Sequence, residues 1–488
     1  MLTYTLEKTR SEPLYSYLSR RIRDDILAGN IRSGERLPSK RPFAKNLGIS
    51  VITVENAYAR LLDEGYIISL PKRGYYASDL KALAALRSNN LPKPEMGKKP
   101  AEKKLLADLT SSQNELSGFP FSVWSGIMRR ELRCDQQALL TNPPTGGVPE
   151  LREAIADHLR AFHGMEVHPS QIVVGPGTEY LIALLVRLLG RNLVYAMEDP
   201  GYPRTGQVYR SLGVPTACAA LDSSGVTVES LENTGASVAH VSPSHNFPTG
   251  VVMPPSRRYE LLGWAAKRSD RYIIEDDYDS EFRLSGKPLS TLKSVDALGR
   301  VIYMNTFTKT LASTVRISYM VLPPELSVRF TRENSYLSCA VSNFEQYTLA
   351  RFMELGSFET HLNRMRRLCL RKRDAFMALI AKGPLGKHAS VSGQNAGLHF
   401  LLTLRTSEND ETIAERALSL GVRIAPLSRF FHDKKKGSAP RICHQLLVSS
   451  PRCPCRNSQG ARAGHVPWRQ TGEITEPARP EALPREFL

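Results

Sequence analysis

The spacing of apolar residues divides the chain into a short helical segment and a long segment in which strands and helices alternate. In the short segment, Leu14, Leu18, Ile22 and Ile26 recur every four residues. This period places the four side chains on one face of an α-helix. We therefore expect a helix that buries this face in a small core of its own.

Two more helices and a β-hairpin are expected after this first helix. Ser39 is a suitable N-cap for the second helix and Ser50 for the third, because a serine oxygen accepts hydrogen bonds from free backbone N–H groups. Residues 66–77 alternate like two strands around the turn P-K-R-G at 71–74. Three short helices and a basic-tipped hairpin are typical of a winged helix-turn-helix domain, which we place at residues 11–79.

From residue 108 onward, apolar strand-like runs alternate with amphipathic helical segments. Strands are predicted at residues 171–175, 192–197, 214–220, 237–242, 272–275, 301–305 and 317–322, and helices at 178–189 and 256–267. Such alternation predicts an α/β domain with a mainly parallel central sheet. Ligands of such sheets bind beyond the carboxyl ends of the strands, so this is where we look for a site. We place this domain at residues 106–443.

Two further segments differ in composition from these domains. Residues 80–105 contain seven Lys and Arg residues against two Glu, together with three prolines, which predicts a basic flexible linker. Residues 444–488 are rich in proline and arginine and lack an amphipathic period. We predict that they form an atypical, disordered C-terminal tail.

Charge and cysteine content narrow the class of protein. A net charge of +17 favours a polyanionic partner such as nucleic acid. The seven cysteines include no CxxC pair, which favours a reducing compartment and no structural metal site. No uninterrupted apolar run reaches the length of about 18 residues that a membrane helix requires. We therefore expect a cytoplasmic protein without a membrane partner.

Candidate chemistry lies directly after three of the predicted strands. Lys309 follows the run V-I-Y-M-N-T-F-T, and burial there would favour the neutral amine that an aldehyde needs to form a Schiff base. Asp276 follows the strand at 272–275, and Gly177-Thr178 opens a helix whose N–H groups would suit a phosphate. The alternatives are a surface lysine, a helix-capping acid and an ordinary glycine turn.

The short segment resembles the GntR-type DNA-binding domain. The matching stretches are P-L-Y-S-Y-L, G-E-R-L-P-S-K-R, L-G-I-S-V-I-T-V-E-N-A-Y and L-D-E-G-Y-I. The resemblance implies binding to double-stranded DNA through the start of the third helix and through basic residues on phosphates. The residues concerned are Ser39, Lys40, Arg41, Ser50, Thr53, Asn56, Lys72 and Arg73. Val51 and Ile52 stand where the family often has arginine, so we expect base readout either to be weaker or to rest on Thr53, Glu55 and Asn56.

The long segment resembles the aminotransferase-like domain of the MocR regulators, the GntR subfamily that joins this domain to a winged helix. The motifs G-V-P-E-L-R-E-A-I, G-P-G-T-E, E-D-P-G-Y, P-S-H-N-F-P-T-G, E-D-D-Y-D-S-E-F and T-F-T-K-T-L match in the family's order. The resemblance implies a PLP-dependent transferase domain of the aspartate aminotransferase-like fold (fold type I). It also implies pyridoxal 5'-phosphate (PLP) as the cofactor.

The same resemblance assigns roles around the cofactor ring. Lys309 would hold the cofactor as an internal aldimine, and Asp276 would pair with the pyridinium nitrogen. Tyr278, together with either His245 or Asn246, would hydrogen-bond the 3′-oxygen of the ring.

Further roles concern the ring face, the phosphate and an effector. Tyr202 would stack on the ring. The phosphate would be bound by Gly177, Thr178, Thr306, Thr308 and Arg316. Arg204 and Arg441 would bind an effector carboxylate, because a guanidinium offers two parallel donors.

Two principal functions follow from these expectations. The first is a PLP-dependent transcription regulator that senses an amino acid, an amine or PLP and acts as a domain-swapped homodimer. The second is a PLP-dependent aminotransferase with an appended DNA-binding head, with a transaminase half-reaction as its activity. A product altered at its C-terminus, which binds DNA but no effector, is a third alternative. A complete DNA-binding head contributes nothing to catalysis, which favours the regulator.

Overall fold

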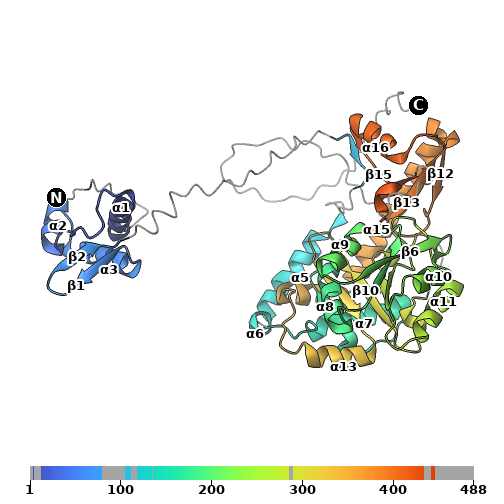
Figure 1. The fold of residues 1–488 in the computed structure, drawn as a ribbon, viewed down its shortest axis with the longest axis horizontal. Helices are drawn as coiled ribbons and strands as arrows, with labels where there is room; N and C mark the ends of the chain where they lie inside the picture. Colours follow the sequence, from blue (N-terminus) through green and yellow to red (C-terminus); the bar gives the residue numbers. More distant parts are fainter. Residues whose placement is uncertain are drawn as a thin grey trace, which may run out of the picture. The chain divides into compact units, whose positions relative to one another are not determined.

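The computed structural model describes residue 4 and residues 13–79, 105–110, 118–134, 136–284, 290–432 and 441–445. The chain forms two compact units, Met1–Glu102 and Lys103–Leu488 (Figure 1). The predicted linker at 80–105, apart from its last residue, lies outside the described residues. The predicted tail at 444–488 lies outside them beyond residue 445. The domain boundaries given above stay predictions.

The first unit has the predicted order of three helices and a hairpin within residues 13–79. The elements are α1 (Leu14–Ala28), α2 (Lys40–Leu47), α3 (Val51–Asp63), β1 (Ile67–Leu70) and β2 (Gly74–Ala77), and the two strands pair antiparallel. Leu18, Ile22, Phe43 and Tyr58 are fully buried in one hydrophobic cluster. The four-residue period of the first helix therefore marks a buried face, as its spacing indicated.

The helix starts follow the predicted caps in part. The Ser50 hydroxyl oxygen accepts a hydrogen bond from the Thr53 backbone N–H at 3.2 Å. Ser39 stands at the N-cap position of α2, but its side chain makes no capping hydrogen bond. The position of Ser39 as the N-cap of α2 was therefore predicted correctly, whereas the capping hydrogen bond of its side chain was not.

The second unit contains, within its described part, an eight-stranded sheet in the order β4-β11-β10-β9-β8-β5-β6-β7. Its strands are β4 (Ile172–Gly175), β5 (Tyr195–Asp199), β6 (Thr216–Asp222), β7 (Gly225–Val226), β8 (Val238–Val241), β9 (Tyr272–Asp276), β10 (Val301–Thr306) and β11 (Ser318–Val321). Neighbouring strands from β10 to β6 pair in parallel. β11 runs antiparallel to both of its neighbours, β10 and β4. Its start therefore lies at the edge of the sheet where the parallel strands end.

Helices cover both faces of this sheet (Figure 1). They are α5 (Phe121–Cys134), α6 (Gln136–Leu140), α7 (Pro149–His163), α8 (Thr178–Leu189), α9 (Pro203–Ser211), α10 (Val228–Asn233), α11 (Pro255–Ala266), α12 (Phe307–Thr310), α13 (Pro324–Glu333), α14 (Asn343–Glu354) and the long α15 (Ser357–Lys382). Successive side chains of a strand point to opposite faces. Tyr303 accordingly packs in the cluster of α7 and α14, while Ile302 and Met304 pack in the cluster of α8.

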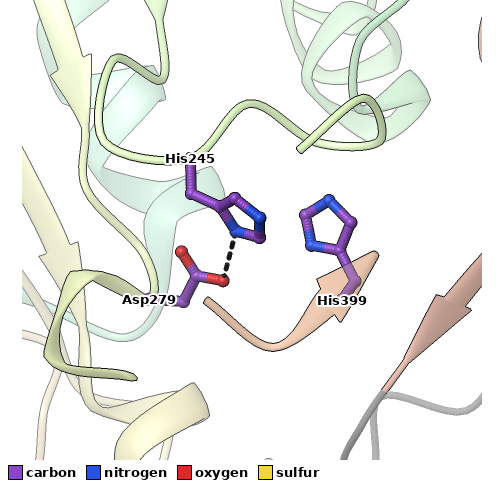
Figure 2. Close-up of side chains that lie close together, drawn as sticks. All are labelled: His245, Asp279 and His399. Carbon is purple, nitrogen blue, oxygen red and sulfur yellow. Dashed lines mark hydrogen bonds and ion pairs between the residues drawn. The ribbon is translucent and has the colours of Figure 1, made fainter. Parts of the chain in front are cut away.

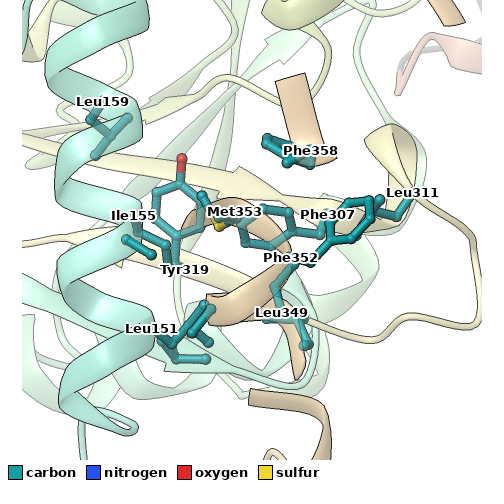
Figure 3. Packing of buried hydrophobic residues seen from close by; sticks show 14 of the residues in the cluster. Leu151, Ile155, Leu159, Phe307, Leu311, Tyr319, Leu349, Phe352, Met353 and Phe358 are labelled. Carbon is teal, nitrogen blue, oxygen red and sulfur yellow. The ribbon is translucent and has the colours of Figure 1, made fainter. Parts of the chain in front are cut away.

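The cluster beneath α7 and α14 also anchors the segment that carries Lys309. Phe307 and Leu311 are buried in it beside Tyr319, Phe352 and Phe358 (Figure 3). Their burial fixes the backbone on both sides of the lysine. Lys309 is therefore held in one place by its apolar neighbours in sequence.

A smaller sheet completes the second unit. Within the described residues its order is β12-β13-β16-β15, formed by β12 (Ala389–Ser392), β13 (His399–Leu404), β16 (Arg441–Gln445) and β15 (Ala425–Pro426), with α16 (Asp410–Ser419) nearby in sequence. A short parallel pair joins β3 (Ala107–Asp108) to β14 (Val422–Arg423). Short 3-10 turns occur at Pro169–Gln171, Ser280–Phe282, Lys293–Val295, Pro384–Lys387 and Leu427–Phe430. β16 extends two residues beyond the predicted domain end at residue 443.

Candidate functional site

A cavity of about 270 Å³ lies at the edge of the large sheet where the parallel strands end. The predicted residues that line it are Thr178, Tyr202, Arg204, Asp276, Tyr278, Thr306, Thr308, Lys309 and Arg316. They come from the last residues of β9 and β10, from segments that follow β4, β5, β9 and β10, and from the residues just before β11. The topology of the sheet therefore brings together side chains that are up to 138 residues apart in sequence, from Thr178 to Arg316.

Lys309 lies on the wall of this cavity in α12. Burial lowers the pKa of its ammonium group below the ordinary value, and the nearby charge of Arg204 lowers it further. The carboxylates of Asp279 and Asp276 act in the opposite direction, but burial outweighs them. A lysine with a lowered pKa offers more of the neutral amine that reacts with an aldehyde.

Asp276 ends β9 and offers one carboxylate oxygen without a hydrogen-bond partner among the described residues, Oδ1. Its other oxygen, Oδ2, lies 3.4 Å from Nε2 of His240. Nδ1 of His240 in turn lies 2.9 Å from the Tyr209 hydroxyl, and both side chains are buried. An orphaned carboxylate oxygen on a cavity wall fits a protonated ring nitrogen, which is the group that PLP presents.

Gly177, a predicted phosphate ligand, is the N-cap residue of α8 and is not among the described residues that line the cavity. Gly177 has a φ of 111°, and a Cβ atom at this position would lie 2.3 Å from Nη2 of Arg316. Only a glycine leaves room for the arginine to approach the backbone here. Thr178, Thr306, Thr308 and Arg316 line the cavity. These donors fit a phosphate group.

His245 and Asn246 are not among the residues that line the cavity in the described part of the chain. Nδ1 of His245 lies 2.9 Å from Oδ2 of Asp279, and the side chain points away to His399 of β13 (Figure 2). The Leu398 N–H also donates to Oδ2 of Asp279. The three buried side chains therefore join the loop after β8 to the small sheet.

Tyr278 is the member of the predicted 3′-oxygen pair that reaches the cavity. Its hydroxyl donates a hydrogen bond to the His245 backbone carbonyl at 2.9 Å. Asn246 instead donates through Nδ2 to Oε2 of Glu198 at 2.7 Å. The cavity side of this loop is formed by Phe247, one residue further along the chain.

Arg441 is likewise absent from the cavity lining among the described residues. It begins β16, opposite Thr403 of β13 in the small sheet. Arg204, by contrast, lines the cavity from the first turn of α9. Of the two predicted carboxylate ligands only Arg204 therefore lines the cavity among the described residues, and the role of Arg441 stays a prediction.

The sequence reasoning assigned no role to several residues that line the cavity, above all Glu179, Glu198, His240 and Phe247. Glu179 and Glu198 stand inside motifs that pointed to the site, G-P-G-T-E and E-D-P-G-Y, so their position in sequence was a usable signal. His240 lies within β8, where a lone histidine gave no such signal.

Glu198 is a buried carboxyl group on this wall. Burial raises its pKa to about 7, and the negative charge of Asp276 contributes. The hydrogen bonds that Oε2 accepts from Asn246 and from the Ser242 N–H act against this rise. Glu198 therefore exchanges its proton near neutral pH beside Asp276.

The predicted DNA-binding residues lie on the surface of the first unit. Most of their side chains are exposed: Ser39, Arg41, Ser50, Asn56, Lys72 and Arg73. Thr53 and Lys40 are half-buried. Nζ of Lys40 forms an ion pair with Oε1 of Glu55 at 2.6 Å, so two side chains expected to meet DNA bind each other. Val51 and Ile52 are also exposed, by 40% and 68%.

No helix among the described residues combines the length and the apolar character needed to cross a bilayer.

Family models match both units. Residues 14–76 match the model described as bacterial regulatory proteins, gntR family, and residues 108–442 match aminotransferase class I and II. A crystal structure of Pyrococcus horikoshii kynurenine aminotransferase superposes with a TM-score of 0.62 at 24% identity, covering 77% of this chain and 91% of that one. An archaeal alanine:glyoxylate aminotransferase gives a TM-score of 0.64 at 25% identity, with coverages of 72% and 88%. The predicted fold class is confirmed.

Relatives that match along most of the chain are regulators. The HTH-type transcriptional regulator YdeL of Bacillus subtilis (strain 168) is 35% identical over 428 residues, or 88% of this chain and 92% of the relative. The probable rhizopine catabolism regulatory protein MocR of Rhizobium meliloti is 32% identical over 448 residues, with coverages of 89% and 90%. The pyridoxine biosynthesis regulator PdxR of Corynebacterium glutamicum is 28% identical over 414 residues, with coverages of 85% and 88%. The chain therefore belongs to the MocR subfamily of gntR-type transcription regulators, in which a DNA-binding helix-turn-helix unit is joined to an aminotransferase-like domain whose cofactor is pyridoxal phosphate.

Proposed function

We propose that this regulator senses a small amine, an amino acid or PLP itself through the cavity around Lys309. The observation that carries the proposal is the presence of Lys309, Asp276, Tyr278 and Arg204 in the lining of one cavity. These groups are an amine, a ring-nitrogen partner, a phenol and a guanidinium. They are complementary to an aldehyde cofactor and to a ligand that carries an amino group.

When bound, PLP supplies an aldehyde that condenses reversibly with amines and a ring that withdraws electrons. Lys309 would bind the aldehyde carbon, since burial favours its neutral amine. Asp276 would hold the proton at the ring nitrogen through Oδ1. Tyr202, which is 48% exposed and lines the cavity, would cover one face of the ring.

An incoming amine that takes the place of Lys309 on the cofactor aldehyde would release the buried lysine side chain from the cofactor. The nearby carboxylates of Asp279 and Asp276 would favour the protonated form of this released lysine amine. Because Asp279 also binds His245 and the Leu398 N–H, such a shift acts on the contact between the central sheet and the small sheet. A ligand changes a conformational equilibrium only through such differences in contacts between two states.

The proposal includes a domain-swapped homodimer on double-stranded DNA. Apolar side chains on α5 and α6 are open to solvent, among them Phe121 at 60% and Leu140 at 79% exposure. Exposed apolar side chains grouped on neighbouring helices favour coverage by a second copy. Light scattering after size-exclusion chromatography tests this, since a monomer at micromolar concentration would contradict it.

The experiment for sensing follows visible absorbance while PLP, and then candidate amines and amino acids, are added to purified protein. We expect a band near the edge of the visible range with PLP, its loss in Lys309→Ala and a shift on addition of the effector. Lys267→Ala is the matched control, because Lys267 is exposed and pairs with Glu232 outside the cavity. A band that survives in Lys309→Ala would contradict the role of this lysine.

A working aminotransferase is the second candidate. It is favoured by the same cavity, which holds both a Schiff-base lysine candidate and a ring-nitrogen partner. Keto-acid analysis in the presence of PLP and amino acids separates the two functions. Spectral shifts without keto acid, accompanied by altered binding to DNA selected from a random pool, support sensing, whereas turnover with unaltered DNA binding supports the enzyme.

A further inference from the structure

Glu179 has no role in the functions described so far, although it lies at the centre of the charged groups of the cavity. Its Oε2 atom lies 2.9 Å from Nη2 of Arg316, and its Oε1 atom lies 3.4 Å from Nη1 of Arg204. One carboxylate thus bridges the predicted phosphate arginine and the predicted effector arginine. The three side chains remain partly open, with exposures of 34%, 47% and 60% for Glu179, Arg316 and Arg204.

The carboxylate also lies close to the turn that would hold the phosphate. A Cβ atom built on Gly177 would lie 2.9 Å from Oε2 of Glu179 and 2.3 Å from Nη2 of Arg316. The Glu179 carboxylate and the Arg316 guanidinium therefore meet directly over the backbone of this glycine. A phosphate that binds the same backbone and the same guanidinium competes for this space.

The negative charge of the Glu179 carboxylate also favours competition with a phosphate. Although burial opposes its ionisation, the pKa of Glu179 lies below the ordinary value, because its own backbone N–H and the charges of Arg316 and Arg204 stabilise the carboxylate. A phosphate group near neutral pH carries one to two negative charges. A carboxylate and a phosphate at hydrogen-bond distance from the same guanidinium nitrogen lie close enough to repel each other.

We infer that Glu179 is an internal competitor for the cofactor phosphate: its carboxylate occupies Arg316 and must leave it when the phosphate binds. Arg204 is the guanidinium that remains within its reach. When the phosphate binds Arg316, the Glu179 carboxylate keeps Arg204 as its only arginine partner of the two. Binding of the cofactor is thereby linked to Arg204, the residue proposed to bind the effector.

The test compares PLP with pyridoxal, which has the same aldehyde and ring but no phosphate, by titration of the visible band. In Glu179→Gln we expect PLP to bind about two- to fivefold more tightly, because an exposed ion pair contributes little. Pyridoxal should bind the variant and the wild type equally. Glu150→Gln is the matched control, since Glu150 is an exposed acid in the first turn of α7 and makes no contact with the cavity.

Glu179→Asp separates direct competition from the long-range field of the charge, because aspartate keeps the charge but shortens the side chain. We expect it to bind PLP more tightly than the wild type. PLP affinity that is unchanged or weaker in Glu179→Gln would overturn the inference and identify Glu179 as a residue that positions Arg316. Equal tightening for pyridoxal would also overturn it. Absence of any PLP band in the wild type would instead refute the cofactor site itself.

Discussion

Replacement of Asp276 by asparagine tests the ring-nitrogen partner on which the cofactor site depends. The carboxylate is 19% exposed, and Oδ1 has no partner within the described residues, so solvent screens its interaction only in part. A hydrogen bond to a charged group contributes about 1.5–3 kcal/mol. At about 1.4 kcal/mol for each factor of ten, Asp276→Asn should weaken PLP binding about 10- to 150-fold.

The assay is titration of PLP by absorbance, together with a thermal melt of each variant. Asp277→Asn is the matched control, because this neighbouring carboxylate accepts hydrogen bonds from Ser280 and Tyr303 and lies outside the cavity lining of the described residues. We expect Asp277→Asn to lower the melting temperature and to leave the dissociation constant for PLP nearly unchanged. If Asp276→Asn bound PLP within twofold of the wild type, the proposed pairing with the ring nitrogen would be wrong.

Three further predictions concern stability and DNA binding. Burial raises the pKa of the Glu281 carboxyl group to about 7, above its value of about 4.3 in the unfolded chain. As pH rises, the unfolded chain therefore loses this proton before the folded protein does. The free energy of unfolding of the wild type should consequently fall between about pH 4.5 and about pH 7. Glu281→Gln should show a smaller fall in melting temperature over that range, and an equal fall would contradict the assignment. Phe307→Ala should cost about 3–5 kcal/mol of unfolding free energy in a denaturant titration and weaken PLP binding at Lys309; a cost below about 1 kcal/mol would refute the anchoring argument. Lys72→Ala and Arg73→Ala should each lower the slope of log affinity against log salt by about 1 in DNA-binding titrations, and an unchanged slope would exclude a phosphate contact.

The sequence by itself determined the elements of the first unit and the alternation of strands and helices in the second. Apolar periods predicted α1 and the strands of the large sheet other than β7, because burial on one face or on both faces leaves a pattern that can be read residue by residue. The sequence motifs predicted the family and the cofactor, and the comparisons confirm both predictions. They also placed Lys309 and Asp276 at the ends of strands, and the structure finds both in the lining of one cavity.

Only the tertiary structure decided which side chains meet. The antiparallel direction of β11 brings Arg316 to the edge where the parallel strands end, and this pairing depends on contacts between segments far apart in sequence. The structure likewise turns His245 toward Asp279 and presents Phe247 to the cavity, a choice that rests on hydrogen bonds to distant residues. The bridge formed by Glu179 has the same origin. Spacing along a strand tells which end of the sheet a residue occupies, whereas the partner of its side chain is set by atoms that other segments bring there.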